Sequence, residues 1–255
     1  MFRFASLGSG SRGNATLVQS DSTTLLIDCG YAVKELVRRC NLLGVEPASI
    51  DAVLVTHEHG DHMRGVGALA RRFGLPVWMS HGTWHAADYG KVEQLQLFNS
   101  HDGAIRLGDV EVMPVAVPHD AREPTQFVLR HADLALGLLT DLGSHTPHLA
   151  DCYAELDALL LECNHDLDML AAGPYPPSLR ARVGSNYGHL NNMQAAHFLR
   201  SINHGRLRHL VAAHLSEKNN LPALARAALC EAVPDIEPRL TLLQQDGPSA
   251  WFDVA

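Results

Sequence analysis

A short segment, residues 57–62, carries three imidazoles and two carboxylates in the order His-Glu-His-Gly-Asp-His. It directly follows the apolar run Ala52–Val55, which is typical of a buried strand. Because a strand end is rigid, it directs these side chains into one crevice, and a tight turn at Gly60 is expected to fold the last two residues back. Zinc and similar divalent ions prefer imidazole nitrogen and carboxylate oxygen as ligands. The spacing therefore predicts a site for two divalent ions rather than a histidine-rich turn without function.

This segment fits the H-x-H-x-D-H signature and so resembles the metallo-β-lactamase superfamily. The other landmarks of that superfamily follow in the right order, and three of them come after apolar runs. They are Asp28 in Leu-Leu-Ile-Asp-Cys-Gly, His119 in Val-Pro-His-Asp, Asp141 in Leu-Leu-Thr-Asp-Leu-Gly and His214 in Ala-Ala-His-Leu-Ser. For each alone a plain loop position is the alternative, but their joint order favours one common site.

The resemblance implies a fold and a set of ligands. The fold is α/β, a four-layer αβ/βα sandwich of the metallo-β-lactamase type, and Asp28 would support the metal-binding loop. Zinc and manganese suit these ligands, and iron is also compatible with them. The implied ligands are His57, His59 and His119 for the first ion, Asp61, His62 and His214 for the second, and Asp141 for both.

Further segments resemble the YycJ-type (WalJ) subfamily, whose members are described as metal-dependent nucleases with a proposed 5′-to-3′ DNA exonuclease activity. These segments are the opening Leu-Gly-Ser-Gly-Ser-Arg-Gly-Asn, Leu160–Asp166, Gly188–Ala196 and His214–Asn220. The pattern is also similar to tRNase Z, in which a histidine with a carboxylate partner lies beside the phosphate. His189 and Glu162 occupy those places here. Asn191-Asn192 replaces the Ser-Thr of tRNase Z, which weakens the tRNA-processing interpretation.

The expected reaction is hydrolysis of a phosphodiester by a hydroxide that bridges the two ions. Asp61 would orient this nucleophile, and His189, held by Glu162, would donate a proton to the leaving group. Substrate contacts are expected from Arg12 in the glycine-rich turn and from Asn164 and His165. A histidine that only caps a helix is the alternative at His165 and His189, and a solvated side chain is the alternative at Arg12.

Other functions remain open at this point. The same fold hosts many chemistries, so a small-molecule cyclic phosphodiesterase and a glyoxalase II-like thioesterase or lactonase are the alternative enzymes. A binding or regulatory module without catalysis is a third alternative. The expected partner is nucleic acid, with DNA favoured, or a small phosphodiester, and the resemblance also allows a homodimer.

The elements that must position these residues alternate between strands and helices, with an antiparallel stretch in the middle. Gly173–Pro177 is expected to be a surface loop. The expected helices are Tyr31–Leu43, Met63–Phe73, Gly82–Tyr89, Met193–Ile202 and Leu221–Ala232. The expected strands are Phe2–Leu7, Ala15–Gln19, Thr24–Asp28, Ala52–Val55, Val77–Ser80, Leu95–Phe98, Ala104–Leu107, Val110–Val117, Thr125–Arg130, Leu134–Thr140, Leu156–Glu162, His209–Ala213 and a late strand pair between Leu240 and Val254.

The glycine-rich turn Gly8–Asn14 matches G-x-G-x-x-G, the fingerprint of dinucleotide-binding proteins. That function requires a helix to begin within the glycine run. The residues that follow, Ala15–Gln19, are strand formers, so a loop that lines a cleft is the better interpretation.

The bulk composition fits one globular domain over residues 1–255. The chain is 46% hydrophobic and its formal net charge is −8, which argues against a protein that grips nucleic acid by a basic surface alone. The odd count of five cysteines without a CxxC pair favours free thiols. No signal peptide or long apolar stretch is evident, so a cytoplasmic protein without membrane contact is expected.

Overall fold

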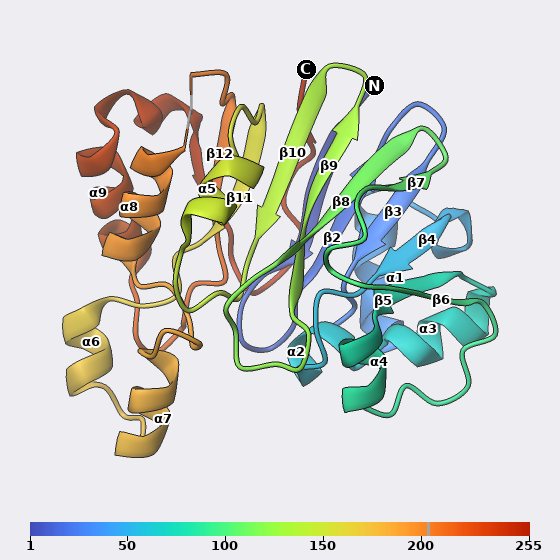
Figure 1. Cartoon of the computed structure of the whole chain (residues 1–255), viewed down its shortest axis with the longest axis horizontal. Helices are drawn as coiled ribbons and strands as arrows, with labels where there is room; N and C mark the ends of the chain where they lie inside the picture. The colour runs from blue at the N-terminus through green and yellow to red at the C-terminus, as the bar shows by residue number, and fades with distance from the viewer. Residues whose placement is uncertain (203–204) are drawn as a thin grey trace.

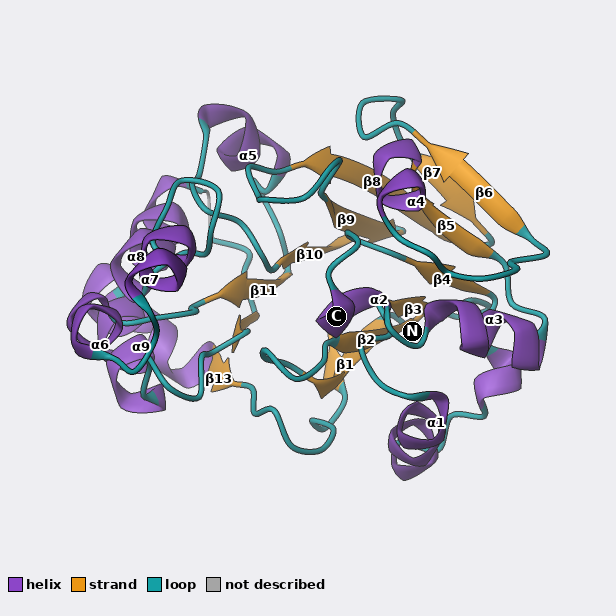
Figure 2. Ribbon diagram, turned by 90° about the horizontal axis from the view of Figure 1, so that it is seen from below, coloured by secondary structure: helices purple, strands orange, loops and turns teal. Residues whose placement is uncertain are grey.

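Two seven-stranded mixed β-sheets form the centre of the computed structural model, which describes residues 1–202 and 205–255 (Figures 1 and 2). The first sheet has the order β14-β1-β2-β3-β4-β5-β6 and the second the order β13-β12-β11-β10-β9-β8-β7. The strands of the first sheet are β1 (Arg3–Gly8), β2 (Ala15–Gln19), β3 (Thr24–Ile27), β4 (Ala52–Leu54), β5 (Val77–Ser80), β6 (Leu95–Phe98) and β14 (Phe252–Asp253). Those of the second are β7 (Ile105–Leu107), β8 (Val110–Ala116), β9 (Thr125–His131), β10 (Leu134–Leu139), β11 (Ala158–Glu162), β12 (His209–Ala213) and β13 (Leu240–Leu242).

Helices cover the outer face of each sheet. In Figure 2, α8 and α9 lie outside the second sheet and α1 and α3 lie outside the first. Two apolar sheets covered in this way make four layers, so the predicted α/β four-layer sandwich is confirmed. The helices are α1 (Val33–Leu42), α2 (Gly60–Met63), α3 (Val66–Phe73), α4 (His81–Ala86), α5 (Pro147–Cys152), α6 (Leu167–Ala172), α7 (Pro177–Val183), α8 (Asn192–Ser201) and α9 (Pro222–Ala232), with 3₁₀ turns at Pro47–Ser49 and Pro234–Arg239.

The apolar runs of the sequence become strands that are buried on both faces. In β11, Ala158 and Leu160 point into the core between the two sheets, whereas Leu159 and Leu161 pack against the outer helices. Side chains alternate between the faces of a strand, so a strand covered on both sides needs a continuous apolar run. This is why the central strands were predictable within a few residues.

One sequence expectation was wrong, and two helices were not expected. The expected tight turn at Gly60 is present as the single-turn helix α2, in which the N–H of His62 donates to the carbonyl of His59 at 2.9 Å. The late strands do not pair with each other: β13 pairs with β12 in the second sheet, and β14 pairs with β1 in the first. The surface loop Gly173–Pro177 is flanked by α6 and α7, which were not predicted because neither helix carries an apolar stripe long enough to show a period.

The glycine-rich turn behaves as expected. No helix begins within it, and Gly8 and Gly10 have φ values of 146° and 144°, a region that side chains rarely adopt. The nearby Ser11 lines a cavity at one end of the sheets. The part of the chain that the structure describes contains no helix of the length and apolarity needed to cross a bilayer.

Candidate metal centre and active site

The candidate residues gather where strands of both sheets end. Asp28 directly follows β3, Asp141 lies two residues after β10, and His214 directly follows β12. All three residues adopt left-handed backbone conformations, with φ of 63°, 56° and 54°. Such conformations cost free energy in residues other than glycine, and they cluster at functional sites. The backbone is therefore bent at three strand ends in a way that turns polar side chains into one space.

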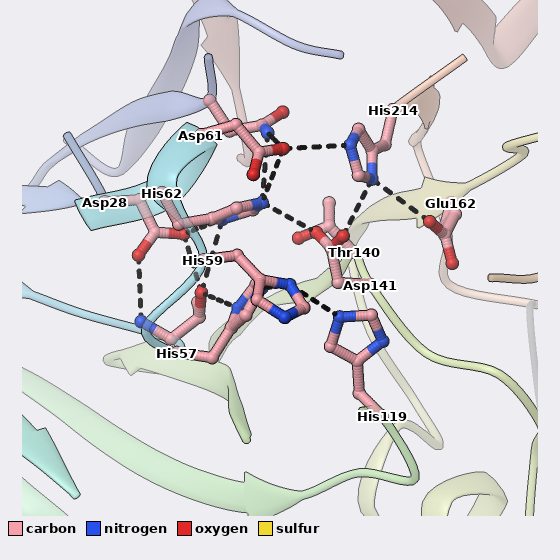
Figure 3. A network of polar contacts seen from close by, with 12 residues as sticks. Asp28, His57, His59, Asp61, His62, His119, Thr140, Asp141, Glu162 and His214 are labelled. Carbon is pink, nitrogen blue, oxygen red and sulfur yellow. Dashed lines mark hydrogen bonds and ion pairs between the residues drawn. The ribbon is translucent and has the colours of Figure 1, made fainter. Parts of the chain in front are cut away.

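Three imidazoles converge in a first cluster, formed by His57, His59 and His119 (Figure 3). Nδ1 of His59 lies 3.1 Å from Nε2 of His57 and 3.2 Å from Nε2 of His119. The other nitrogen of His119, Nδ1, donates to the carbonyl of Gly188 at 2.8 Å. This hydrogen bond fixes the tautomer of His119 and leaves its Nε2 lone pair directed at the cluster.

A second cluster joins Asp61, His62 and His214 beside Asp141. Nε2 of His62 lies 3.0 Å from Oδ2 of Asp141 and 3.6 Å from Oδ2 of Asp61, and Nε2 of His214 lies 3.6 Å from the same Asp61 oxygen. Asp141 also groups with His57 of the first cluster and His62 of the second, so it lies between the two, where the resemblance implies a shared ligand. His57 and His62 are fully buried.

Asp28 orients the loop that carries both clusters. Its carboxylate accepts hydrogen bonds from the backbone N–H and the hydroxyl of Thr56, each at 2.8 Å, and from Nδ1 of His62 at 2.7 Å. A carboxylate behind a ligand histidine fixes the ring orientation and raises the basicity of the ligand. Asp28 therefore has the supporting place that the sequence predicted.

Buried charges shift the pKa values of the second cluster. Burial lowers the pKa of His62, but the carboxylates of Asp141, Asp28 and Asp61 outweigh it and raise that pKa well above 6.5. The pKa of His214 is raised well above 6.5 in the same way. In contrast, burial and the neighbouring imidazoles lower the pKa of His57 well below 6.5. Without a metal, His62 and His214 therefore hold protons at neutral pH, whereas His57 stays neutral.

These donors fit divalent metal ions. An ion with four tetrahedral ligands at about 2.0–2.1 Å separates neighbouring ligand nitrogens by about 3.3 Å, close to the spacing in the first cluster. Oδ2 of Asp141 is fully buried and accepts no hydrogen bond of good geometry from the residues that the structure describes. In the metal-free chain the ion pair with Nε2 of His62 at 3.0 Å compensates this buried charge, and a bound cation would do so in its place. The donor atoms of the seven predicted ligands are therefore compatible with divalent metal ions.

Glu162 connects this centre to His189. Its Oε1 accepts from Nδ1 of His189 at 2.8 Å and from Nδ1 of His214 at 3.1 Å, while Oε2 accepts from the N–H groups of Leu142 and Leu190. Burial raises the pKa of Glu162, but His189 and His214 outweigh this effect and hold it at about 2. The carboxylate therefore stays ionised and keeps both rings in place. The predicted Glu162–His189 contact is present.

The three predicted substrate-binding residues do not line the cavity at the site. The Arg12 guanidinium forms ion pairs with Glu217 and Asp246 at 2.8 and 3.0 Å. Asn164 is buried and donates to the carbonyl of His214 at 3.1 Å, so it supports the backbone behind a predicted ligand. His165 is also buried; neither ring nitrogen has a hydrogen-bond partner among the described residues, and burial lowers its pKa to about 4.

A cavity of about 320 Å³ opens over the two clusters and is lined by His59, Asp61, Asp141, His189 and His214, among others. This volume is in the range of small-ligand sites.

Three other residues at the site were not predicted from the sequence. Asn14 of the glycine-rich turn places its amide 3.0 Å from Nε2 of His62, and a polar residue at the end of that turn was a signal that could have found it. Asp120 and Arg182 also line the cavity; Asp120 directly follows the predicted ligand His119, which could have indicated it, whereas no local pattern marks Arg182.

Comparison with known proteins agrees with the fold. The family model of the metallo-beta-lactamase superfamily matches residues 8–157. The chain therefore belongs to the metallo-β-lactamase superfamily.

Within this superfamily, the chain is 34% identical over 235 residues to the exodeoxyribonuclease YycJ of Bacillus anthracis, covering 91% of this chain and 89% of that protein. It is 33% identical to the exodeoxyribonuclease WalJ of Streptococcus pneumoniae serotype 2, covering 89% and 87%. The crystal structure of the metallo-beta-lactamase fold protein YhfI from Bacillus subtilis superimposes with a TM-score of 0.77 at 16% identity, covering 98% and 99%. The resemblance to the YycJ-type subfamily is thus confirmed, and the YhfI comparison supports the fold.

Proposed function

We propose that this chain is a dinuclear metal-dependent phosphodiesterase that degrades DNA as an exonuclease. The observation that carries the proposal is that the carboxylate of Glu162 accepts hydrogen bonds both from His189 and from the predicted ligand His214. This arrangement supports a role for His189 as the proton donor beside the proposed metal centre. The names of the YycJ and WalJ relatives support DNA as the substrate.

Zinc or manganese suits the donor set of the two clusters. The first ion would be held by His57, His59 and His119, and the second by Asp61, His62 and His214, with Asp141 beside both. Bound there, the ions would supply Lewis acidity and a nucleophile at neutral pH by lowering the pKa of water.

The chain's own residues supply proton transfer and positioning. His189 lines the cavity, and Glu162 raises its pKa above the ordinary value against the opposing effect of burial. A protonated His189 can donate to the leaving oxygen of a phosphodiester, which requires a filled proton site at neutral pH. Asp61 also lines the cavity, and we assign it the role of accepting a hydrogen bond from the attacking water.

A small cyclic phosphodiester is the second candidate substrate. The net charge of −8 and the modest cavity favour a compact ligand over a long polyanion. Hydrolysis of a cyclic nucleotide and of a thioester by the same preparation compares these alternatives directly.

The test is hydrolysis of 5′-end-labelled duplex DNA by the purified chain with manganese or zinc, beside the His59→Ala variant. We expect stepwise release of mononucleotides by the wild type and loss of release by the variant, because His59 stands in the middle of the first cluster. Absence of release from the folded, metal-loaded wild type would reject the exonuclease activity.

The resemblance also allows a homodimer. Analytical ultracentrifugation of the same preparation measures the oligomeric state and tests this expectation.

The cellular setting is part of the proposal. All five cysteines are free thiols, two of them at intermediate exposure, which suits the reducing cytoplasm. Fractionation of cells that express the chain at native level tests this location.

A further inference from the structure

The segment between β11 and α8 brings an arginine to the cavity. Its two short helices, α6 and α7, lie beyond the end of α8 at the lower left of Figure 1. No residue of α7 is buried in the core. The end of α7 is nevertheless anchored at the site, because the carbonyl of Val183 accepts a hydrogen bond from the N–H of His189 at 2.9 Å. One face of α7 therefore borders the cavity through Leu179, Arg182 and Val183.

Arg182 is held over the first cluster by a carboxylate. Its Nε donates to Oδ2 of Asp120, while Oδ1 of Asp120 lies 3.5 Å from Nε2 of His119 and 3.8 Å from Nε2 of His59. The guanidinium is thus one carboxylate away from two predicted metal ligands. Its side chain remains 58% exposed, so it can reach a ligand in the cavity.

The charged side chains that line the cavity are mostly acidic, so a cationic side chain there has a particular role to fill. Asp61, Asp120 and Asp141 line the cavity, and within residues 1–202 and 205–255 Arg182 is the only lysine or arginine that does so. Bound metal ions would neutralise the reacting phosphate but not the phosphates next to it. A nucleic-acid strand in an acidic cavity needs a cation for a neighbouring phosphate, and guanidinium matches phosphate with two parallel N–H donors.

We propose that Arg182 is a substrate-binding residue that holds a phosphate adjacent to the scissile one and so favours a strand over an isolated phosphodiester. The inference rests on the proposed phosphodiesterase function and names a contact that selects its substrate. In the free protein, Asp120 keeps the guanidinium at the rim of the cavity. On binding, the phosphate replaces this carboxylate as a hydrogen-bond acceptor.

The test is binding of a 5′-fluorescein-labelled phosphorothioate oligonucleotide to the metal-loaded chain, followed by fluorescence anisotropy at several salt concentrations. Wild type is compared with Arg182→Ala, Arg182→Lys and the matched control Arg180→Ala. Arg180 is on the same helix but does not line the cavity, and it donates to the carbonyl of Ala171. Circular dichroism verifies that each variant is folded.

We expect Arg182→Ala to weaken binding about tenfold and to make the slope of log affinity against log salt shallower by about 0.7, the value for one single-strand phosphate contact. Arg182→Lys should keep the salt slope but lose part of the affinity, because lysine is a point charge without the bidentate fork. Arg180→Ala should bind within twofold of wild type. Equal losses in Arg182→Ala and Arg180→Ala, or an unchanged slope in Arg182→Ala, would overturn the inference.

The Asp120→Asn variant distinguishes two roles for Arg182: binding a substrate phosphate, or only holding α7 in place through its ion pair with Asp120. If Arg182 only ties α7 to Asp120, this variant should lose affinity as Arg182→Ala does, and that result rejects the inference. If Arg182 binds phosphate, removing the competing carboxylate should leave affinity equal or higher. A wild type that binds the oligonucleotide through Arg182 but cleaves no phosphodiester would reject the proposed function alone. A wild type that cleaves DNA while Arg182→Ala binds it normally would reject the inference alone.

Discussion

At the residue scale, Glu162 determines which nitrogen atoms of His189 and His214 carry a proton. It is completely buried, ionised, and bonded to the Nδ1 atoms of both His189 and His214. The Nδ1–H of each ring donates to it, so the Nε2 atoms of the two histidines are left for other partners. For His214 that partner is the second cluster, and for His189 it is the cavity.

His189→Ala should lower kcat for DNA hydrolysis by about 10²–10⁴, the usual contribution of a general acid, while bound metal stays unchanged. The pKa of His189 is raised, so wild-type activity should fall as the pH rises through that pKa and the proton is lost. The variant should lack this alkaline decline. Rate–pH profiles and metal analysis check both points, with His197→Ala as a control because the ring of His197 packs against that of His145 and does not line the cavity. Wild-type rates in His189→Ala would remove the assigned role.

Metal binding should release protons. The pKa values of His62 and His214 are raised well above 6.5, so both rings carry a proton at neutral pH in the metal-free chain. A ligand imidazole must be neutral, and metal affinity should therefore rise with pH, about tenfold per pH unit for each proton released. Calorimetric titration in buffers of different ionisation enthalpy counts these protons. An affinity that is constant between about pH 6 and 8 would contradict the raised pKa values.

At the element scale, the site depends on strand ends and on one close approach. Gly188 stands where the end of α7 meets the residues before α8, and its carbonyl holds Nδ1 of His119. A Cβ atom at this position would lie 2.2 Å from the carbonyl oxygen of Val183 and 2.3 Å from that of Arg182. Glycine is thus required by backbone contact, and α7, His119 and His189 are positioned together.

Gly188→Ala should therefore weaken binding of the first metal ion by about 10–100-fold, as the loss of a supporting contact to a ligand histidine commonly does. Gly184→Ala is the matched control, because a Cβ there would meet its nearest neighbours at 3.4 Å, an ordinary contact. Competition with a chromophoric chelator measures both affinities. If the two variants behaved alike, the close approach at Gly188 would not control the site.

At the scale of the whole molecule, the two ends of the chain meet in the first sheet. Phe4 pairs with Phe252, and the N–H of Val254 donates to the carbonyl of Phe2 at 2.9 Å. The core between the sheets combines residues from both halves of the chain. We propose on these grounds that residues 1–255 form one domain.

One domain should unfold in a single cooperative transition. The three tryptophans, Trp78, Trp84 and Trp251, all pack with the first sheet or its helices. Their fluorescence should report the same urea midpoint as far-UV circular dichroism, which reports the whole chain. Separate midpoints would show that the two halves unfold independently. Removal of residues 250–255 should lower the common midpoint, because β1 loses its partner β14.

The amino-acid sequence by itself determined the histidine-rich motif and the central strands, because each is expressed in neighbouring residues. A buried strand needs a continuous apolar run, and a metal loop needs several donors within one turn of chain. Only the tertiary structure decided which distant residues meet. Arg182 reaches the cavity through the packing of α7, β13 and β14 enter different sheets, and Arg12 turns to Glu217 and Asp246 instead of the cavity. Such contacts join residues that are far apart in the sequence and form only when the whole chain has folded. A local pattern of residue types therefore does not predict them.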